Sequence, residues 1–321
     1  MARMNHDHLT DRHSEARTMT QLGINTCFAV KRWPRPADWA PIVRDEFGLD
    51  LVQVSLDLVD VTRDADSMAR DVDEHLEAAA RYGIRLHSAF TGLAGYSSNL
   101  LLHPSERERH AAERWYERAI DFAARVGATS MGGHVGAFSV PDWADPARRG
   151  QLWEELRVRL GRLAGVARRC GLEGLLVENL AARREPSTMT DIESLITVGD
   201  SERVPIQLCL DVGHMCVPDT QGEERDPYAW LRRMGGRASV IQIQQGDTEG
   251  DRHWPFTARY EDVGRIDPDR VLEALGREVM APLVLEVIPA FEAPDADVLA
   301  DLVESARCWH EAIARTEYPV V

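Results

Sequence analysis

The chain has 321 residues, of which 44% are hydrophobic and 28% charged, a composition typical of a soluble globular protein with a sizeable core. Its formal net charge of −16 repels phosphate backbones at long range, which argues against a nucleic-acid partner. The five cysteines show no C-x-x-C spacing, so we expect neither a disulfide framework nor a structural zinc site. No apolar stretch reaches the length of a membrane span, so we expect a cytoplasmic protein without a membrane partner.

The first 20 residues differ in character from the rest of the chain. Residues 1–20 are polar and lack periodicity, although they contain His6, His8 and His13. Such a segment is typical of a flexible N-terminal leader, and we expect a single folded domain over residues 21–321. A translation start at Met19 and a metal-binding arm are the alternative interpretations.

After residue 20, short apolar runs alternate with segments of helical periodicity. Most of these runs are continuously apolar, as expected of parallel strands that are covered on both faces. The predicted strands begin at Leu22, Leu51, Ile84, Ser130, Glu173, Ile206, Val240 and Pro282.

Two of the intervening segments carry helix boundary signals. The segment from Met68 predicts a helix that ends at Gly83, and the segment from Ser105 begins with a capping-box spacing to Glu108. Eight strands that alternate with helices predict a single (β/α)8 TIM barrel. The alternative, an open doubly wound sheet, lacks support because no G-x-G-x-x-G turn follows the first strand.

Polar residues stand at the C-terminal ends of the last four predicted strands. Glu178, Asp211, Gln244 and Glu286 are each separated by about one strand-plus-helix unit. Barrel enzymes place their active sites at this end of the strands, so we expect the four side chains to converge there. A single such glutamate would more often be a helix cap or a surface ion pair.

Taken together, these residues indicate a metal site. Ionised carboxylates within apolar runs need a partner of opposite charge, and no Lys or Arg lies within or beside these runs. One divalent ion, Mn²⁺, Mg²⁺ or Co²⁺, is the natural partner for carboxylate and amide oxygens. The sequence therefore predicts a metal held by Glu178, Asp211, Gln244 and Glu286.

The pattern resembles the xylose-isomerase-like superfamily of sugar isomerases and epimerases. That family ligates metal through Glu on the fifth strand, Asp of a D-x-x-H motif on the sixth, His on the seventh and Glu on the eighth. This chain matches with Glu178, Asp211 followed by His214, and Glu286, and departs with Gln244 in place of the histidine. The loop over residues 244–257 resembles a subgroup of erythrulose-phosphate 3-epimerases.

The resemblance implies a metal-dependent epimerase that inverts C3 of a short-chain ketose phosphate through a cis-enediolate. In this scheme Glu178 and Glu286 are the two catalytic acid–base groups, on opposite faces of C3. The alternatives are an aldose–ketose isomerase on a small sugar or sugar phosphate and a non-catalytic sugar-binding barrel. A DNA-repair endonuclease is disfavoured by Gln244 and by the acidic charge. The resemblance also implies a homo-oligomer, although no interface is identified.

Further polar residues are candidates to bind the sugar or sugar phosphate. His87 and His134 are expected at the third and fourth strand ends, although a lone histidine there is more often structural. Arg252 and His253 are the candidates for a phosphate group, because Arg offers a fork of donors. The complete predicted substrate-binding set is Asn25, Gln53, His87, His134, His214, Arg252 and His253.

Overall fold

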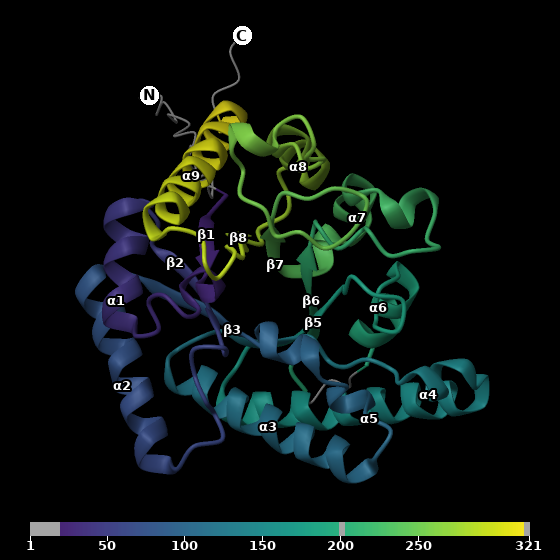
Figure 1. Cartoon of the computed structure of the whole chain (residues 1–321). Helices are drawn as coiled ribbons and strands as arrows, with labels where there is room; N and C mark the ends of the chain where they lie inside the picture. Colours follow the sequence, from purple (N-terminus) through teal and green to yellow (C-terminus); the bar gives the residue numbers. More distant parts are fainter. Residues whose placement is uncertain (1–19, 199–202, 318–321) are drawn as a thin grey trace, which may run out of the picture.

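Eight parallel strands form a closed barrel in the computed structural model, which describes residues 20–198 and 203–317 (Figure 1). The predicted leader lies outside the described residues, apart from Thr20. The first and last strands pair in parallel and close the barrel, with Leu22 beside Leu283. The predicted TIM barrel is confirmed. The strands are β1 (Leu22–Asn25), β2 (Leu51–Ser55), β3 (Arg85–Phe90), β4 (Ser130–Gly133), β5 (Gly174–Glu178), β6 (Ile206–Asp211), β7 (Ala238–Ile243) and β8 (Leu283–Leu285).

Helices surround the strands and form an outer ring (Figure 1). They alternate with the strands along the chain, as predicted. Short helical turns also follow some strands, among them η1 (Thr26–Ala29) after β1 and η3 (Leu93–Ser97) after β3. The α-helices are α1 (Pro36–Pro41), α2 (Ala65–Tyr82), α3 (Glu106–Arg125), α4 (Val140–Ala144), α5 (Pro146–Cys170), α6 (Met189–Ile196), α7 (Pro227–Met234), α8 (Pro268–Leu275) and α9 (Asp295–Glu317).

The helix boundary signals are confirmed in one case and wrong in the other. Helix α2 ends at Gly83, whose φ of 62° lies in the left-handed region that favours glycine. Ser105 is the N-cap residue of α3, but the predicted capping box does not form. The reason is local: the Ser105 backbone N–H donates to His103 Nδ1, and Glu108 pairs with Arg107 instead.

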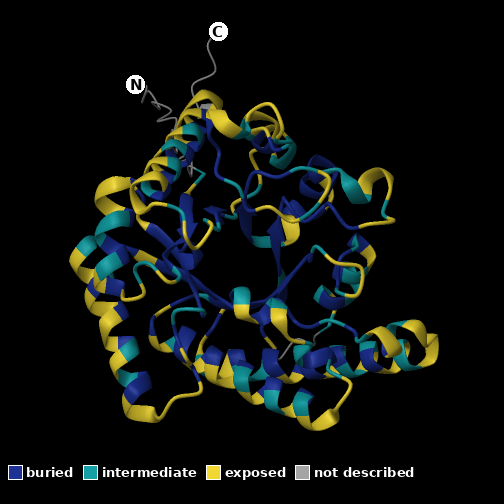
Figure 2. Ribbon diagram, viewed as in Figure 1, coloured by how far each residue is buried: buried dark blue, intermediate teal, exposed yellow. Residues whose placement is uncertain are grey.

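Two separate apolar clusters build the core. The larger one fills the space between the strands and the surrounding helices, where the ribbon is buried (Figure 2). The smaller one follows the two-residue period of the strands and comprises Leu51, Phe90, Leu176, Cys209, Val240 and Val284. Leu176 shares a face of β5 with Glu178, as Cys209 does with Asp211 on β6, because alternate strand residues point the same way. The smaller cluster therefore forms an apolar floor beneath the polar residues at the strand ends.

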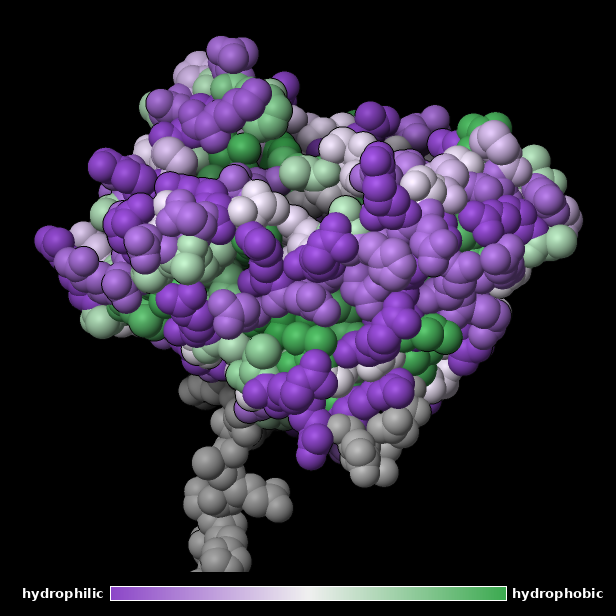
Figure 3. Space-filling view, turned by 90° about the horizontal axis from the view of Figure 1, so that it is seen from below, coloured by the Kyte–Doolittle hydropathy of each residue, from purple (hydrophilic) through white to green (hydrophobic). Residues whose placement is uncertain are grey.

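The outer surface is mainly polar. Hydrophilic side chains dominate the face shown in Figure 3, with smaller hydrophobic areas between them. Among the described residues, no helix combines the length and the apolar character that crossing a membrane requires.

Candidate metal centre at the barrel mouth

Three carboxylates come together at the C-terminal ends of their strands. Glu178 is the last residue of β5, Asp211 is the last residue of β6, and Glu286 directly follows β8. All three side chains are buried, and one oxygen of each lies within 4.8 Å of the others. Residues far apart in the sequence thus converge at the barrel mouth, and the group could hold a metal ion.

Both glutamates keep one oxygen, Oε2, without a hydrogen-bond partner in the described part of the chain. Burial raises the pKa of Glu178 to about 8, with His214 opposing and Asp211 reinforcing the shift. Burial, followed by the charges of Asp211 and Glu178, raises the pKa of Glu286 well above its usual range. Buried carboxylate oxygens without donors need a cation to remain ionised, so this donor set fits a divalent metal.

The other oxygen of Glu286 is held by two amides. Asn25 Nδ2 and Gln242 Nε2 donate to Oε1 of Glu286 at 3.0 and 2.8 Å. The same two amides donate to Oε1 of Gln53 at 2.8 and 2.9 Å. All of these side chains are buried. Two predicted substrate-binding residues, Asn25 and Gln53, therefore lie in a network that fixes Glu286.

Gln244, the predicted ligand after β7, lies against Asp211. Its Nε2 donates to the two oxygens of Asp211 at 3.1 and 3.0 Å, while its Oε1 accepts from the His253 backbone N–H. A Cβ on Gly213 would lie 2.3 Å from Cδ of Gln244, so this approach requires glycine. In this orientation the amide nitrogen faces Asp211, and ligation through oxygen requires the amide to turn over.

Two histidines flank Asp251 beside the carboxylates. Nε2 of His214 lies 3.4 Å from Oδ2 of Asp251, and Nε2 of His253 lies 3.0 Å from the same carboxylate. Asp211, His214 and His253 each offer a ligand atom within 4.8 Å of the others. Burial lowers the pKa of His214, but Asp211 and Asp251 raise it well above its usual range.

His134 occupies the predicted mouth position directly after β4 and is fully buried. The Gly136 backbone N–H donates to its Nδ1 at 3.0 Å, so the ring proton lies on Nε2, 3.6 Å from Oε1 of Glu185. Burial lowers the pKa of His134 to about 3 and raises the pKa of Glu185 to about 7. The neutral ring and the carboxyl group together offer donors and acceptors that suit the hydroxyls of a small polar molecule.

Of two further predicted substrate-binding residues, His87 lies elsewhere than expected and Arg252 lies on the expected loop. His87 is not at a strand end: β3 continues to Phe90, and the register shift against β2 makes His87 an extra residue in the strand. Arg252 is partly exposed, and its guanidinium pairs with Asp247 at 3.0 Å and lies over the Trp254 ring. Its position on the loop after β7 agrees with the predicted loop, and its phosphate contact stays a prediction.

Four further residues complete the site. Gln242 shares the inward face of β7 with Gln244, so the two-residue period of a strand could have identified it. The other three lie on loops without periodicity. Tyr96 lies in η3 and donates from its hydroxyl to Oε1 of Glu178 at 2.6 Å, while Glu185 and Asp251 follow β5 and β7.

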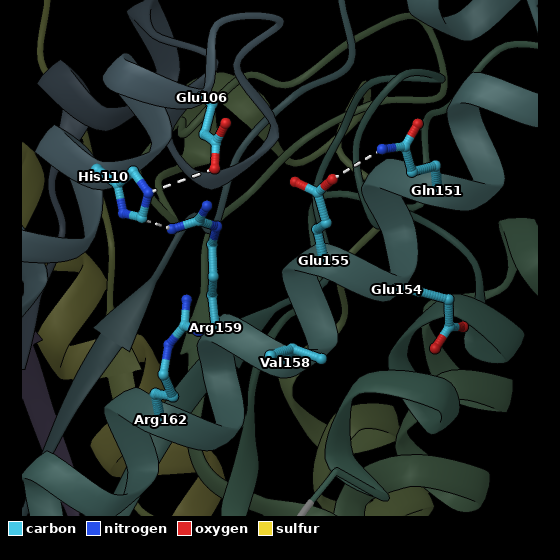
Figure 4. Close-up of a pocket in the computed structure, with 8 residues that line it drawn as sticks. All are labelled: Glu106, His110, Gln151, Glu154, Glu155, Val158, Arg159 and Arg162. Carbon is cyan, nitrogen blue, oxygen red and sulfur yellow. Dashed lines mark hydrogen bonds and ion pairs between the residues drawn. The ribbon is translucent and has the colours of Figure 1, made fainter.

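A separate pocket of about 430 Å³ lies between α3 and α5 (Figure 4). Most of its side chains are charged, and several pair with residues outside the lining, as Arg159 and Arg162 do with Glu113. Its lining residues are Glu106, His110, Gln151, Glu154, Glu155, Val158, Arg159 and Arg162. Because none of the predicted site residues lines it, this pocket is distinct from the barrel mouth.

Comparison with known proteins places the barrel among sugar-converting enzymes. Residues 45–307 match the family model described as xylose isomerase-like TIM barrel. The chain is 27% identical over 298 residues to D-erythrulose 1-phosphate 3-epimerase of Brucella abortus, with 90% of this chain and 94% of that protein covered.

Solved structures of other proteins share this fold. A protein of Rhodospirillum rubrum that has been assigned as a xylose isomerase superposes with a TM-score of 0.84 at 32% identity, with 91% of this chain and 99% of that chain covered. D-psicose 3-epimerase of Clostridium cellulolyticum superposes with a TM-score of 0.64 at 14% identity, with 91% and 99% covered. At that identity the likeness concerns the fold alone.

Proposed function

Because the chain belongs to the xylose isomerase-like TIM barrel family, we propose that it is a metal-dependent epimerase that inverts C3 of a short-chain ketose phosphate. Its relatives make it a sugar isomerase or epimerase. The finer proposal names erythrulose 1-phosphate as the substrate and Mn²⁺, Mg²⁺ or Co²⁺ as the metal. It is supported by the Brucella relative and by the carboxylate group at the barrel mouth.

One observation carries the catalytic proposal. Glu178 and Glu286 come from β5 and β8, which are not neighbours in the barrel, and each has one buried oxygen without a donor in the described residues. Two such carboxyl groups can reach opposite faces of one substrate carbon. Inversion of a stereocentre requires a proton acceptor on one face and a proton donor on the other.

In the proposed reaction, one glutamate removes the proton from C3 of the ketose. The electrons of the C3–H bond form a C2–C3 double bond, and the carbonyl oxygen takes up negative charge to give a cis-enediolate. A bound divalent cation would supply Lewis-acid stabilisation of that charge. The other glutamate then donates a proton to the opposite face of C3. The two carboxyl groups regain their starting states by proton exchange with solvent.

The surrounding residues support this chemistry by position. Asn25 and Gln242 hold Oε1 of Glu286, and the apolar floor beneath the carboxylates limits access of water from below. We propose that His134 and Glu185, which lie 3.6 Å apart, bind substrate hydroxyls. His214 lies between Asp211 and Asp251. We propose Arg252 and His253 as the phosphate contacts.

Product analysis by NMR in deuterated water tests the proposal. With D-erythrulose 1-phosphate and Mn²⁺, we expect the L-epimer with deuterium at C3. Exchange at C1 of free erythrulose, whose C1 hydroxyl carries no phosphate, with formation of an aldose would instead identify an aldose–ketose isomerase. Binding without exchange for a panel of free and phosphorylated ketoses would identify a non-catalytic sugar-binding barrel.

A further inference from the structure

The loop after β3 brings an unexpected side chain to the site. The Tyr96 turn, residues 92–97, lies at the barrel mouth, and the hydroxyl of Tyr96 donates to Oε1 of Glu178 at 2.6 Å. The hydrogen bond links the loop after β3 to the end of β5. It leaves only Oε2 of Glu178 without a partner among the described residues.

The Tyr96 ring is held in one position by its packing contacts. It packs with its edge to the His134 ring, at a centroid distance of 4.8 Å, and contacts the apolar floor of the barrel. An aromatic ring that is fixed on two sides holds its hydroxyl in one place, because a Tyr side chain has few rotatable bonds.

A second residue fixes the backbone that carries this ring. The carboxylate of Asp57, just after β2, accepts from the backbone N–H groups of Leu93 and Ala94 at 2.7 and 2.8 Å. The Ser55 hydroxyl donates to the same carboxylate at 2.7 Å.

The start of the turn is shaped to fit Asp57. Gly92 has a φ of 81°, and a Cβ there would lie 2.5 Å from Oδ2 of Asp57. Only glycine permits this backbone conformation and this close approach. Hydrogen bonds to Asp57 therefore hold the backbone at the start of the Tyr96 turn, and the Tyr96 side chain of the same turn bonds Glu178.

We propose that Tyr96 is a positioning residue that occupies Oε1 of Glu178 and so restricts this glutamate to one free oxygen, and that Asp57 sets the position of Tyr96. A carboxylate can bind a divalent cation through one oxygen or through both. With Oε1 held, Glu178 cannot take the two-oxygen arrangement, and its carboxyl group keeps the orientation that proton transfer needs. This inference rests on the proposed epimerase function.

The test compares the Tyr96→Phe and Asp57→Asn variants with the wild-type protein in two measurements. The first is the affinity for Mn²⁺ alone by isothermal titration calorimetry, and the second is the Mn²⁺-dependent exchange of the C3 proton of erythrulose 1-phosphate. Tyr82→Phe, at the end of α2 near the opposite ends of the strands, serves as the matched control, and thermal melting checks that each variant folds.

For Tyr96→Phe we expect Mn²⁺ affinity equal to or tighter than wild type, an unchanged KM, and a kcat that falls by about tenfold or more, since misplaced catalytic groups cost this much. Asp57→Asn should lower kcat less, and the double variant should be no slower than Tyr96→Phe, because both act through one hydrogen bond. The Tyr82→Phe control should match wild type in both measurements.

Three outcomes would overturn the inference. They are unchanged kcat in Tyr96→Phe, independent and additive losses in the double variant, and weakening of Mn²⁺ binding in parallel with kcat. If the wild-type protein binds Mn²⁺ but exchanges no proton, the proposed function fails. The calorimetry still decides the Tyr96 claim in that case, because weaker Mn²⁺ binding by Tyr96→Phe contradicts it.

Discussion

Glu178 and Glu286 lie at the C-terminal ends of non-neighbouring strands and have matching environments: in each, Oε1 accepts a hydrogen bond while the buried Oε2 has no partner among the described residues. Asp211 completes the group within 4.8 Å. Two carboxyl groups with one free oxygen each can hold a cation and exchange protons with a substrate placed between them. This pairing is the basis of the predictions that follow.

Replacement of either glutamate should abolish turnover. We expect Glu178→Gln and Glu286→Gln to lower kcat by about 10³-fold, because each removes an acid–base group and a charged oxygen near the metal. Mn²⁺ affinity by calorimetry should fall in both variants. Glu173→Gln is the matched control, since Glu173 is exposed and directly precedes β5, the strand that ends at Glu178. Activity above one tenth of wild type in either variant would contradict the assignment.

The metal-free protein should lose stability as pH rises. The folded-state pKa of Glu178 is raised from 4.5 to about 8, so between these values the folded state binds a proton that the unfolded state releases. The raised pKa values of Glu286 and His214 act in the same direction. Below about pH 6.5 the lowered pKa values of His134 and His87 act in the opposite direction, so the free energy of unfolding should fall from about pH 6.5 to about pH 8.

Mn²⁺ should reverse this trend, because protons compete less for the carboxylates at higher pH. Thermal melts at about pH 6.5 and about pH 8, with and without Mn²⁺, provide the measurement. A metal-free protein that is more stable at the higher pH would show that the carboxylates are not held protonated.

Gln242 should contribute to both stability and turnover, although Glu286 is the one predicted metal ligand to which it donates a hydrogen bond. Gln242→Leu removes a donor to Oε1 of Glu286 and to Oε1 of Gln53, and we expect a loss of about 1–3 kcal/mol in the free energy of unfolding. Turnover should fall as well. Gln151→Leu, an exposed residue of α5, is the control for both denaturation and kinetics. Wild-type kcat in Gln242→Leu would exclude a role in fixing Glu286.

Replacement of Arg252 tests whether the substrate is a sugar or a sugar phosphate. We expect Arg252→Ala to raise KM for erythrulose 1-phosphate by about tenfold and to leave KM for free erythrulose unchanged, because the guanidinium would contact only the phosphate. Arg259→Ala, an exposed arginine of the same loop, controls for a general change of charge. Equal effects of Arg252→Ala on both substrates would remove the phosphate assignment.

Much of the barrel follows from local sequence signals. Continuous apolar runs identify parallel strands, and Glu178, Asp211 and Glu286 interrupt such runs at the ends of β5, β6 and β8. The predicted strand starts lie within two residues of the observed ones, with the largest difference at β7, which begins at Ala238. The sequence does not predict the position of His87, because a strand bulge leaves no mark in the hydrophobic pattern.

The remainder of the site depends on contacts between distant segments. The hydrogen bond between Tyr96 and Glu178 joins residues 82 positions apart. Glu185 and Asp251 lie on loops, where no periodicity fixes the direction of a side chain. The Ser105–Glu108 spacing failed as a capping box because a neighbouring His103 took the backbone donor. Such competition between partners is decided by the folded structure.

The central claim is that a divalent metal enables the two glutamates to move the C3 proton. The most direct measurement follows deuterium incorporation at C3 of D-erythrulose 1-phosphate by NMR before EDTA treatment, after it, and after Mn²⁺ or Mg²⁺ is added back. We predict that exchange and L-epimer formation stop with EDTA and return with the metal. Full exchange in the EDTA-treated protein, or none with any metal, would contradict the claim.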